Sequence, residues 1–279
     1  MRQLIILFIV LVLFPQPAEA LWKTNLEMHV IDVGQADSIY IETSNGKHVL
    51  IDSGDEHDGH KVVSYLQKRG IHQIDYLIAT HPHHDHIGSM EDIFKAFEIE
   101  TVYMPDVKYH TTYYKKLMKS ISKSGVERKE AKAGVKVKLA RNISMEFIAP
   151  GKQHYKSLND YSAVVRLEHG KKRFLLMADA GITSENELLK RIDQEKVDVL
   201  KVAHHGANTG TGHALLKKTD PDYAIISVGR KNKYGYPSKD VLKRLKAHDI
   251  RVFRTDKLGT IITKSDGKSV RFFTEFPQS

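Results

Sequence analysis

The chain alternates between short apolar runs and polar stretches, which predicts many short strands and helices. The clearest pair of strands is 38–42 with 47–51, joined by Asn45-Gly46. Asn-Gly is the preferred pair for a two-residue hairpin turn, so these runs are predicted to lie side by side. Further strands are predicted at residues 26–33, 74–79, 135–139, 143–148, 161–167, 173–178, 197–202, 223–228, 251–254, 260–264 and 268–273.

Helical spacing of apolar residues marks a second set of elements. Helices are predicted at residues 61–69, 88–97, 113–124, 184–192 and 238–248. Gly70 and Gly125 follow two of them, as glycine often does at a helix end. Ser184 and Glu187 have the spacing of a capping box, and Ser238 is a suitable cap for the last helix. Strands and helices alternate throughout, which favours one α/β domain.

The first twenty residues follow a different pattern. Arg2 gives a positive start, residues 4–14 are unbroken apolar, and Ala18-Glu19-Ala20 fits a leader cleavage site. We expect residues 1–20 to be a signal peptide and residues 21–279 to form a domain that is secreted or associated with the cell surface. An uncleaved membrane anchor is the alternative, but the run falls short of the roughly 20 apolar residues that a span needs.

Composition narrows the chemistry. The chain has no cysteine, so an exported domain would have no disulfide, and a metal site would have only nitrogen and oxygen ligands. The formal net charge is +9. A basic exported protein favours anionic partners such as nucleic acid, a teichoic-type polymer or a membrane surface, although the same charge also serves plain solubility.

Candidate metal chemistry is concentrated where the predicted strand 74–79 ends. Four of the six residues from His81 to His86 are histidine, and a fifth is Asp85. Neutral imidazole and carboxylate are ligands that first-row divalent metals take. A strand that stops in such a turn holds these side chains at the rim of a sheet.

Three other apolar runs also end at carboxylate or imidazole groups. These are Asp52 after residues 47–51, Asp179 after residues 173–178, and His204 with His205 after residues 197–202. Strand ends lie along one edge of a sheet, so the four groups are able to converge there. A single Asp after a strand is usually a turn former, but four such ends in one chain favour a shared site.

On these residues the chain resembles the metallo-β-lactamase superfamily, and within it the ComEC-like branch of competence-protein hydrolase domains. The segments that carry the resemblance are DVGQADS at 32–38, LIDSG at 50–54, HPHHDHIG at 81–88, LMADA at 176–180, LKVAHHG at 200–206 and NKYGYP at 232–237. Together they span nearly the whole chain after the leader. The resemblance implies an αββα sandwich and a hydrolase that uses two divalent metal ions, Zn²⁺ or Mn²⁺.

The family also implies roles for individual residues. His81 and His83 would hold one metal, Asp85 and His86 the other, and Asp179 would bridge them. Either His204 or His205 would complete the second site, while the other reaches the substrate. The residues expected to support the ligands from behind are Asp32, Asp52, Asn159 and Ser162. The residues expected to do the catalytic work are Asp85, Asp179 and His205.

The chain departs from the wider superfamily at three places, one of which is Ala36, where the family usually has Gly. The chain has no third histidine for the first metal, because the corresponding region, residues 157–162, reads SLNDYS. The ComEC-like branch typically has Asn and Ser there. The first site is therefore expected to be weak, to recruit His154, or to prefer Mn²⁺ with a shell rich in water. Tyr236 stands where the family usually has His; it can donate a hydrogen bond to a phosphate but cannot act as a base near neutral pH.

Two basic stretches are candidates for contact with an anionic polymer. In residues 230–236 the candidates are Lys231, Asn232, Lys233, Tyr234 and Tyr236, because lysines pair with phosphates and tyrosine rings stack on bases. The same residues also fit a solvated loop. The stretch 109–123 fits a groove wall, or a surface helix with Tyr113, Leu117 and Ile121 packed inward.

These features favour an exported, metal-dependent phosphodiesterase or nuclease that acts on DNA through a metal-activated hydroxide. A phosphodiesterase for teichoic-type polymers shares the same charge, location and chemistry. A lactonase, esterase or β-lactamase would share the fold. A DNA-binding accessory to uptake with a weak or inactive site is the non-enzyme alternative.

Overall fold

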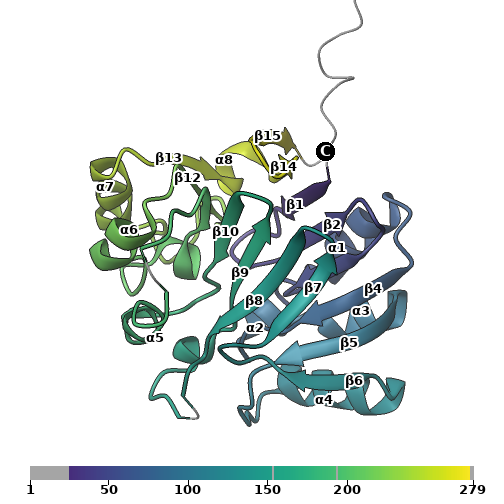
Figure 1. The fold of residues 1–279 in the computed structure, drawn as a ribbon. Helices are drawn as coiled ribbons and strands as arrows, with labels where there is room; N and C mark the ends of the chain where they lie inside the picture. The colour runs from purple at the N-terminus through teal and green to yellow at the C-terminus, as the bar shows by residue number, and fades with distance from the viewer. Residues whose placement is uncertain (1–24, 153, 193, 277–279) are drawn as a thin grey trace, which may run out of the picture.

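The computed structural model describes residues 25–152, 154–192 and 194–276. The signal peptide predicted at residues 1–20 lies outside them. Figure 1 shows two β-sheets that face each other, with helices on the outer face of each sheet. The αββα sandwich expected from the sequence is confirmed.

The first sheet has eight strands. They are β1 (Leu26–Val30), β2 (Ile39–Thr43), β3 (His48–Ile51), β4 (Gln73–Ile78), β5 (Glu98–Met104), β6 (Glu127–Glu130), β14 (Thr260–Ser265) and β15 (Val270–Glu275), in the spatial order β15-β14-β1-β2-β3-β4-β5-β6. β2 and β3 are antiparallel across the Asn45-Gly46 turn, as the sequence predicted. β3 to β6 are parallel, so their carboxyl ends meet at one edge.

The second sheet has seven strands. They are β7 (Lys136–Ala140), β8 (Ile143–Ala149), β9 (Val164–His169), β10 (Lys172–Leu176), β11 (Val199–Lys201), β12 (Tyr223–Ile226) and β13 (Arg251–Arg254), in the order β13-β12-β11-β10-β9-β8-β7. β10 to β13 are parallel. The segments that follow β10 and β11 therefore leave the sheet at the same edge.

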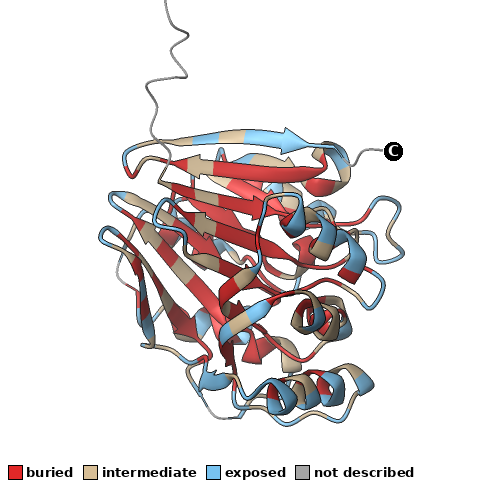
Figure 2. Cartoon of the chain, turned by 90° about the vertical axis from the view of Figure 1, so that its right-hand side faces the viewer, coloured by how far each residue is buried: buried red, intermediate tan, exposed pale blue. Residues whose placement is uncertain are grey.

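Helices form the two outer layers. They are α1 (Gly59–Gln67), α2 (His84–Ile87), α3 (Met90–Ala96), α4 (Thr112–Ser124), α5 (Ile182–Leu188), α6 (His213–Thr219), α7 (Lys239–Ala247) and α8 (Thr255–Leu258), with 3₁₀ turns at Leu158–Tyr161 and Ala203–Gly206. α1, α3 and α4 pack on the first sheet, and α5, α6 and α7 on the second. In Figure 2 the sheets are largely buried, while the helices expose their outer faces.

Three apolar layers stabilise this arrangement. Met28, Ile41 and Phe147 belong to the layer between the two sheets, where all three are fully buried. Two further layers lie beneath the helices; Leu66 represents the one on the first sheet, and Leu245 the one on the second. Such burial is the dominant favourable term in folding, and no disulfide adds to it.

Some elements differ from the sequence prediction. The capping box is wrong: α5 begins at Ile182 with Gly181 before it, and Ser184 is buried in its first turn without capping it. Glu187 instead accepts a hydrogen bond from Tyr155, and the helix ends at Leu188. The helix predicted at residues 88–97 is α3, Met90–Ala96, and a separate short helix, α2, which was not predicted, precedes it at His84–Ile87. β5, β6 and α6 were not predicted.

No helix within the described ranges has both the length and the apolarity that a membrane crossing requires.

Candidate metal centre

The second half of the histidine-rich segment folds as one helical turn, α2, whereas His81 and His83 lie in the short loop between β4 and this turn. Gly88 ends this turn and lies against the loop of residues 54–56, where a Cβ atom at position 88 would come within 2.4 Å of the Glu56 nitrogen. The backbone amide of Gly88 also donates to the Gly54 carbonyl oxygen at 3.1 Å. Only glycine permits this approach, so the turn that carries the candidate ligands is held on a fixed base.

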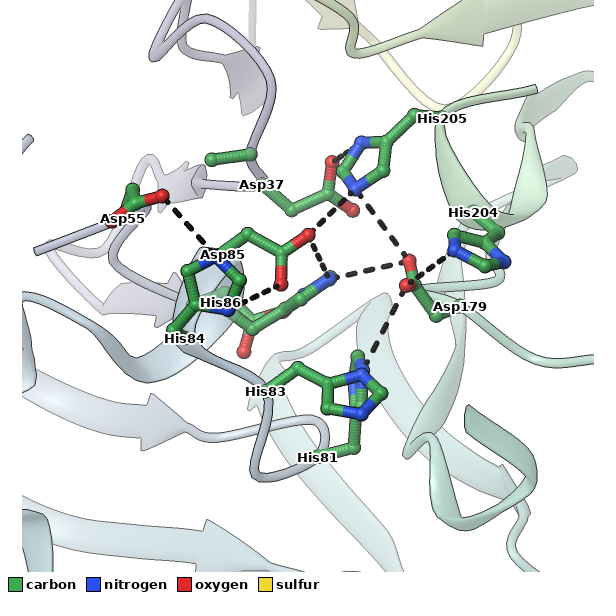
Figure 3. Close-up of polar contacts among 12 residues, drawn as sticks. Asp37, Asp55, His81, His83, His84, Asp85, His86, Asp179, His204 and His205 are labelled. Atoms are coloured by element: carbon green, nitrogen blue, oxygen red, sulfur yellow. Dashed lines mark hydrogen bonds and ion pairs between the residues drawn. The ribbon is translucent and has the colours of Figure 1, made fainter. Parts of the chain in front are cut away.

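Two groups of side chains have the geometry of metal ligands. The first is His81, His83 and Asp179, and the second is Asp85, His86, Asp179 and His205; within each group the ligand atoms lie within 4.8 Å of one another. Asp179 belongs to both groups through different oxygens. Its Oδ2 lies 3.8 Å from His81 Nε2, and its Oδ1 lies 3.2 Å from His86 Nε2 (Figure 3).

The atoms that face the centre of the second group fit a divalent cation. Among the described residues, His86 Nε2 and Asp179 Oδ1 are buried and have no hydrogen-bond partner, because their 3.2 Å approach lacks hydrogen-bond geometry. Buried polar atoms without a partner are costly, and a metal ion would satisfy both. Nitrogen and carboxylate oxygen suit Zn²⁺ and Mn²⁺ alike. The donor set therefore fits two divalent ions with Asp179 between them.

Burial and neighbouring charges set the protonation of this cluster. Burial of His81 lowers its pKa well below the usual value, which keeps it in the neutral form that binds metal. Burial also opposes charge on His86, but Asp179, Asp52 and Asp85 outweigh it and raise the pKa of His86 well above the usual value. Burial likewise opposes charge on Asp179, but His86 and His205 hold its pKa well below the usual value.

Asp52 lies behind His86, where the sequence placed it. Its Oδ2 accepts a hydrogen bond from His86 Nδ1 at 2.7 Å. Thr80 donates to the same carboxylate twice, from its backbone nitrogen at 2.9 Å and its hydroxyl at 2.7 Å. This arrangement fixes the His86 ring with Nε2 toward the centre, as carboxylates behind metal-bound histidines commonly do.

The other three residues predicted to support the ligands differ in their contacts. The Ser162 hydroxyl accepts from the Asp179 backbone nitrogen at 3.2 Å, and the Asn159 amide lies 3.3 Å from His204 Nδ1. Asp32 instead accepts from the Gly34 backbone nitrogen at 3.3 Å, and its carboxylate reaches none of the candidate ligands within the described contacts. It shapes the loop after β1 rather than the centre.

The structure distinguishes the two adjacent histidines. His205 is buried, donates from Nδ1 to the Ser227 carbonyl oxygen at 3.0 Å, and directs Nε2 into the second group. His204 lies outside both groups, with its side chain 22% exposed and its Nε2 3.5 Å from Asp179 Oδ2. His205 is therefore the candidate ligand, and the partly exposed His204 lies beside the centre.

Two residues that the sequence analysis assigned no role lie behind His205. Lys201 is 0% exposed, and its Nζ donates to Asp37 Oδ2 at 2.9 Å. The other oxygen of Asp37 lies 3.5 Å from His205 Nδ1, and the Asp37 backbone nitrogen donates to the Asp85 carbonyl oxygen at 3.1 Å. The sequence signal for this pair is Lys201 itself, which stands inside the apolar run 197–202. A lysine buried in a strand needs a charged partner, so its position indicates a buried ion pair.

The candidate substrate residues lie in the loop between β12 and α7. Lys231, Lys233 and Tyr234 are exposed, and Tyr236 is half-buried beside His204, with ring centroids 5.8 Å apart. Asn232 turns inward, where its amide donates to the Tyr236 carbonyl oxygen at 2.7 Å. It therefore braces the loop and is not free to contact a substrate.

Two other candidates lie apart from the ligand groups. His154 is exposed and lines a cavity of about 390 Å³ together with Lys132 and Arg191, so it joins neither group. The stretch 109–123 forms most of α4, whose Tyr114, Leu117 and Ile121 are buried against the first sheet. Its inward face thus includes Tyr114, while Tyr113 is only partly buried.

This fold and ligand pattern agree with a known family. Residues 31–230 match the model of the metallo-β-lactamase superfamily, and the chain belongs to that superfamily. Its curated relatives place it in the ComEC-like branch. It is 32% identical to ComE operon protein 3 of Bacillus subtilis, over 84% of this chain and 32% of that protein. It is 26% identical to competence protein ComA of Neisseria gonorrhoeae, over 87% and 33% respectively.

The chain thus spans about a third of the length of these relatives. Solved structures agree on the fold. Igni18, a metallo hydrolase from Ignicoccus hospitalis, aligns with a TM-score of 0.53 at 14% identity, over 89% of this chain and 99% of that one. Zn²⁺-bound PqqB from Methylobacterium extorquens aligns with a TM-score of 0.53 at 12% identity, over 81% and 98%. Family and fold together support a metal-dependent hydrolase.

Proposed function

We propose that this protein is an exported phosphodiesterase that cleaves DNA at a two-metal centre. The observation that carries the proposal is the pair of ligand groups that share Asp179, close to a loop with the exposed lysines Lys231 and Lys233. The net charge of +9 favours a polyanion over a neutral ester or lactam. The competence proteins among the relatives favour DNA as that polyanion.

The ligand set defines the chemistry. Divalent ions held by these residues would supply Lewis-acid chemistry, which lowers the pKa of bound water and stabilises negative charge on phosphate oxygens. Asp179 would contribute a ligand to both ions. His81 and His83 would hold the first ion, and Asp85, His86 and His205 the second. Because Asp52 and Ser227 orient His86 and His205 from behind, the ligands need little rearrangement.

His204 is suited to contact the phosphate. His204 Nδ1 lies 3.3 Å from the Asn159 amide nitrogen and 3.0 Å from the Thr209 hydroxyl. With these two groups donating to Nδ1, the ring proton lies on Nε2, the atom that is 3.5 Å from Asp179. Burial lowers the pKa of His204, so the ring is neutral near neutral pH. A neutral ring with this tautomer is a hydrogen-bond donor for a phosphate oxygen or for the leaving group. This role replaces the catalytic one that the sequence analysis gave to His205.

Cleavage assays with the chain from residue 21 onward test the proposal. The substrates are labelled single- and double-stranded DNA, a glycerol-phosphate polymer, a lactone and a β-lactam, each with Mn²⁺, Zn²⁺ or EDTA. We expect metal-dependent cleavage of DNA that is lost in Asp179→Asn and retained in the matched control His154→Gln. Metal-bound protein that cuts only the polymer or the ester would exclude DNA as the substrate, and protein that binds DNA without cutting would indicate an accessory.

Export is tested separately. We expect the protein recovered from the culture medium or the cell surface to begin at Leu21, because the leader pattern ends at Ala20. Amino-terminal sequencing of that material checks the position. Protein found only inside the cell with Met1 intact would contradict export without affecting the chemistry.

A further inference from the structure

A stacked pair of tyrosine rings leads outward from the metal centre. The rings of Tyr234 and Tyr236 have centroids 5.5 Å apart and planes 18° from parallel. Tyr236 in turn meets the His204 ring at 68°. Because His204 borders Asp179, the three rings form a continuous path from the ligands to the surface. This path is aromatic, whereas the ligand groups themselves are polar.

The loop holds this pair in place before any ligand arrives. The Asn232 side chain donates to the carbonyl oxygens of Gly229 and Tyr236, at 3.0 and 2.7 Å, and accepts from the Tyr236 backbone nitrogen at 2.9 Å. Gly235, with φ of +70°, makes the turn between the two rings in a conformation that favours glycine. A braced loop loses little conformational freedom on binding, so its stacking surface is preorganised.

The outer ring is available to a ligand. Tyr234 is 51% exposed, which is unusual for so large an aromatic side chain, and it is neither a candidate metal ligand nor part of the core. Lys231 and Lys233 precede it in the same loop; both are exposed, and neither forms an ion pair with any described residue. The Lys233 Nζ lies 5.3 Å from the Tyr234 ring centroid. Free cations around an exposed aromatic face are the combination that binds single-stranded nucleic acid.

We infer that Tyr234, backed by Tyr236, is a stacking platform for one unpaired base of a nucleic-acid strand. Lys231 and Lys233 bind the phosphates on either side of that base. The platform selects single strands, because a base inside a duplex has both faces covered by its neighbours and must be unstacked before a ring can reach it. This inference rests on the proposed function only for the placement of the next phosphate at the metals; the binding itself needs no cleavage.

Binding in EDTA tests the platform without cleavage. The probes are a labelled single strand of about 12 nucleotides, its duplex, and the same strand with abasic sites, which keeps the phosphates and lacks the bases. The proteins are the mature wild type, Tyr234→Leu, Tyr234→Phe and Phe276→Leu. Phe276 is the matched control, because it is an exposed aromatic residue (58%) at the end of the described chain, after β15. Fluorescence anisotropy gives each Kd.

We expect Tyr234→Leu to bind the single strand about tenfold more weakly, which corresponds to the loss of one stacked base. Tyr234→Phe and Phe276→Leu should bind as the wild type does. The abasic strand should bind equally weakly to the wild type and to Tyr234→Leu, because each change removes the same contact. Equal affinities of the wild type for all three probes would overturn the platform.

The same proteins distinguish failure of the platform from failure of the proposed function. DNA cleavage by the wild type that Tyr234→Leu leaves unchanged, for single strand and duplex alike, would retain the nuclease and reject the platform. Binding of the single strand that depends on Tyr234, without any metal-dependent cleavage, would retain the platform and reject the nuclease.

Discussion

Asp179 is the residue on which both ligand groups depend. Because its two oxygens face different groups, Asp179→Asn removes charge from both at once. We expect the affinity for the metals to fall on the order of a hundredfold or more at both sites. Metal content after dialysis, measured by plasma mass spectrometry, checks this expectation. His154→Gln should keep the wild-type content, and a variant of Asp179 that still holds two metals would show that the bridge is not Asp179.

Lys201 and Asp37 form a buried ion pair that positions His205. Lys201→Met leaves the Asp37 carboxylate buried without a cation, so we expect the free energy of unfolding to fall by roughly 3–5 kcal/mol. Lys201→Met combined with Asp37→Asn should recover much of that loss, because no uncompensated charge remains. Urea unfolding in EDTA measures both. A double variant no more stable than Lys201→Met would argue against the ion pair as the cause.

The raised pKa of His86 predicts that metal affinity depends on pH. In metal-free protein the charged form of His86 contributes stability that is fully present below its ordinary pKa of 6.5 and is lost as the pH rises through the raised value. A metal ion competes with that proton. Affinity for Mn²⁺ should therefore rise by about tenfold per pH unit from pH 6.5 up to the raised pKa of His86, with a proton released on binding. Calorimetry in buffers of different ionisation enthalpy counts the proton; an affinity independent of pH would contradict the expectation.

The sequence revealed the ligands better than their supports. The ligands in the H-x-H-x-D-H turn and Asp179 were predicted because each follows a predicted strand and because metal ligands must be particular residue types. The Lys201–Asp37 pair was not assigned, because an ion pair between residues 164 positions apart depends on how the two halves of the chain pack. Which of the two histidines, His204 or His205, points into the centre is set by the backbone of this turn, in which both residues have positive φ, of 49° and 53°. The sequence alone does not show that conformation.

At the scale of elements, two serines at predicted helix starts give opposite expectations. Ser238 accepts from the Val241 backbone nitrogen at 3.2 Å and caps α7, so Ser238→Ala should lower the free energy of unfolding by about 1 kcal/mol. Ser184 makes no cap, and its buried hydroxyl has no hydrogen-bond partner among the described residues. Ser184→Ala should therefore be neutral or stabilising. Thermal unfolding of the two variants measures both changes in stability. Equal losses of stability in Ser184→Ala and Ser238→Ala would favour a capping role for Ser184.

Most of the predicted elements carry an apolar run or an apolar period. The β2–β3 hairpin, α7 and the buried strands β10, β11 and β12 are examples. β6 reads Glu-Arg-Lys-Glu, and all four residues are exposed at a sheet edge, so no apolar pattern marks it. The sandwich itself followed from the family resemblance, because local patterns do not show that the last three strands divide between two sheets.

For the whole molecule, metal binding is expected to stabilise the fold. At a free concentration a hundred times Kd, each independent site adds about 2.7 kcal/mol. For a domain of this size that raises the Tm by roughly 5–10 °C. Differential scanning calorimetry with Mn²⁺ or Zn²⁺ against EDTA checks the shift, and Asp179→Asn should abolish it. An unchanged Tm in protein that holds metal would mean that the ions bind the unfolded chain equally well.

The positions of the ligands along the chain give this stabilisation a further meaning. His81, His83, Asp85 and His86 follow a strand of the first sheet, whereas Asp179 and His205 follow strands of the second. Each ion would thus cross-link the two halves of a chain that has no cysteine for a disulfide. An enzyme built this way would lose its reactivity and its resistance to proteases together when metal is scarce. Under the proposed export, its lifetime outside the cell would follow the metal supply, and metal-free enzyme would be degraded first.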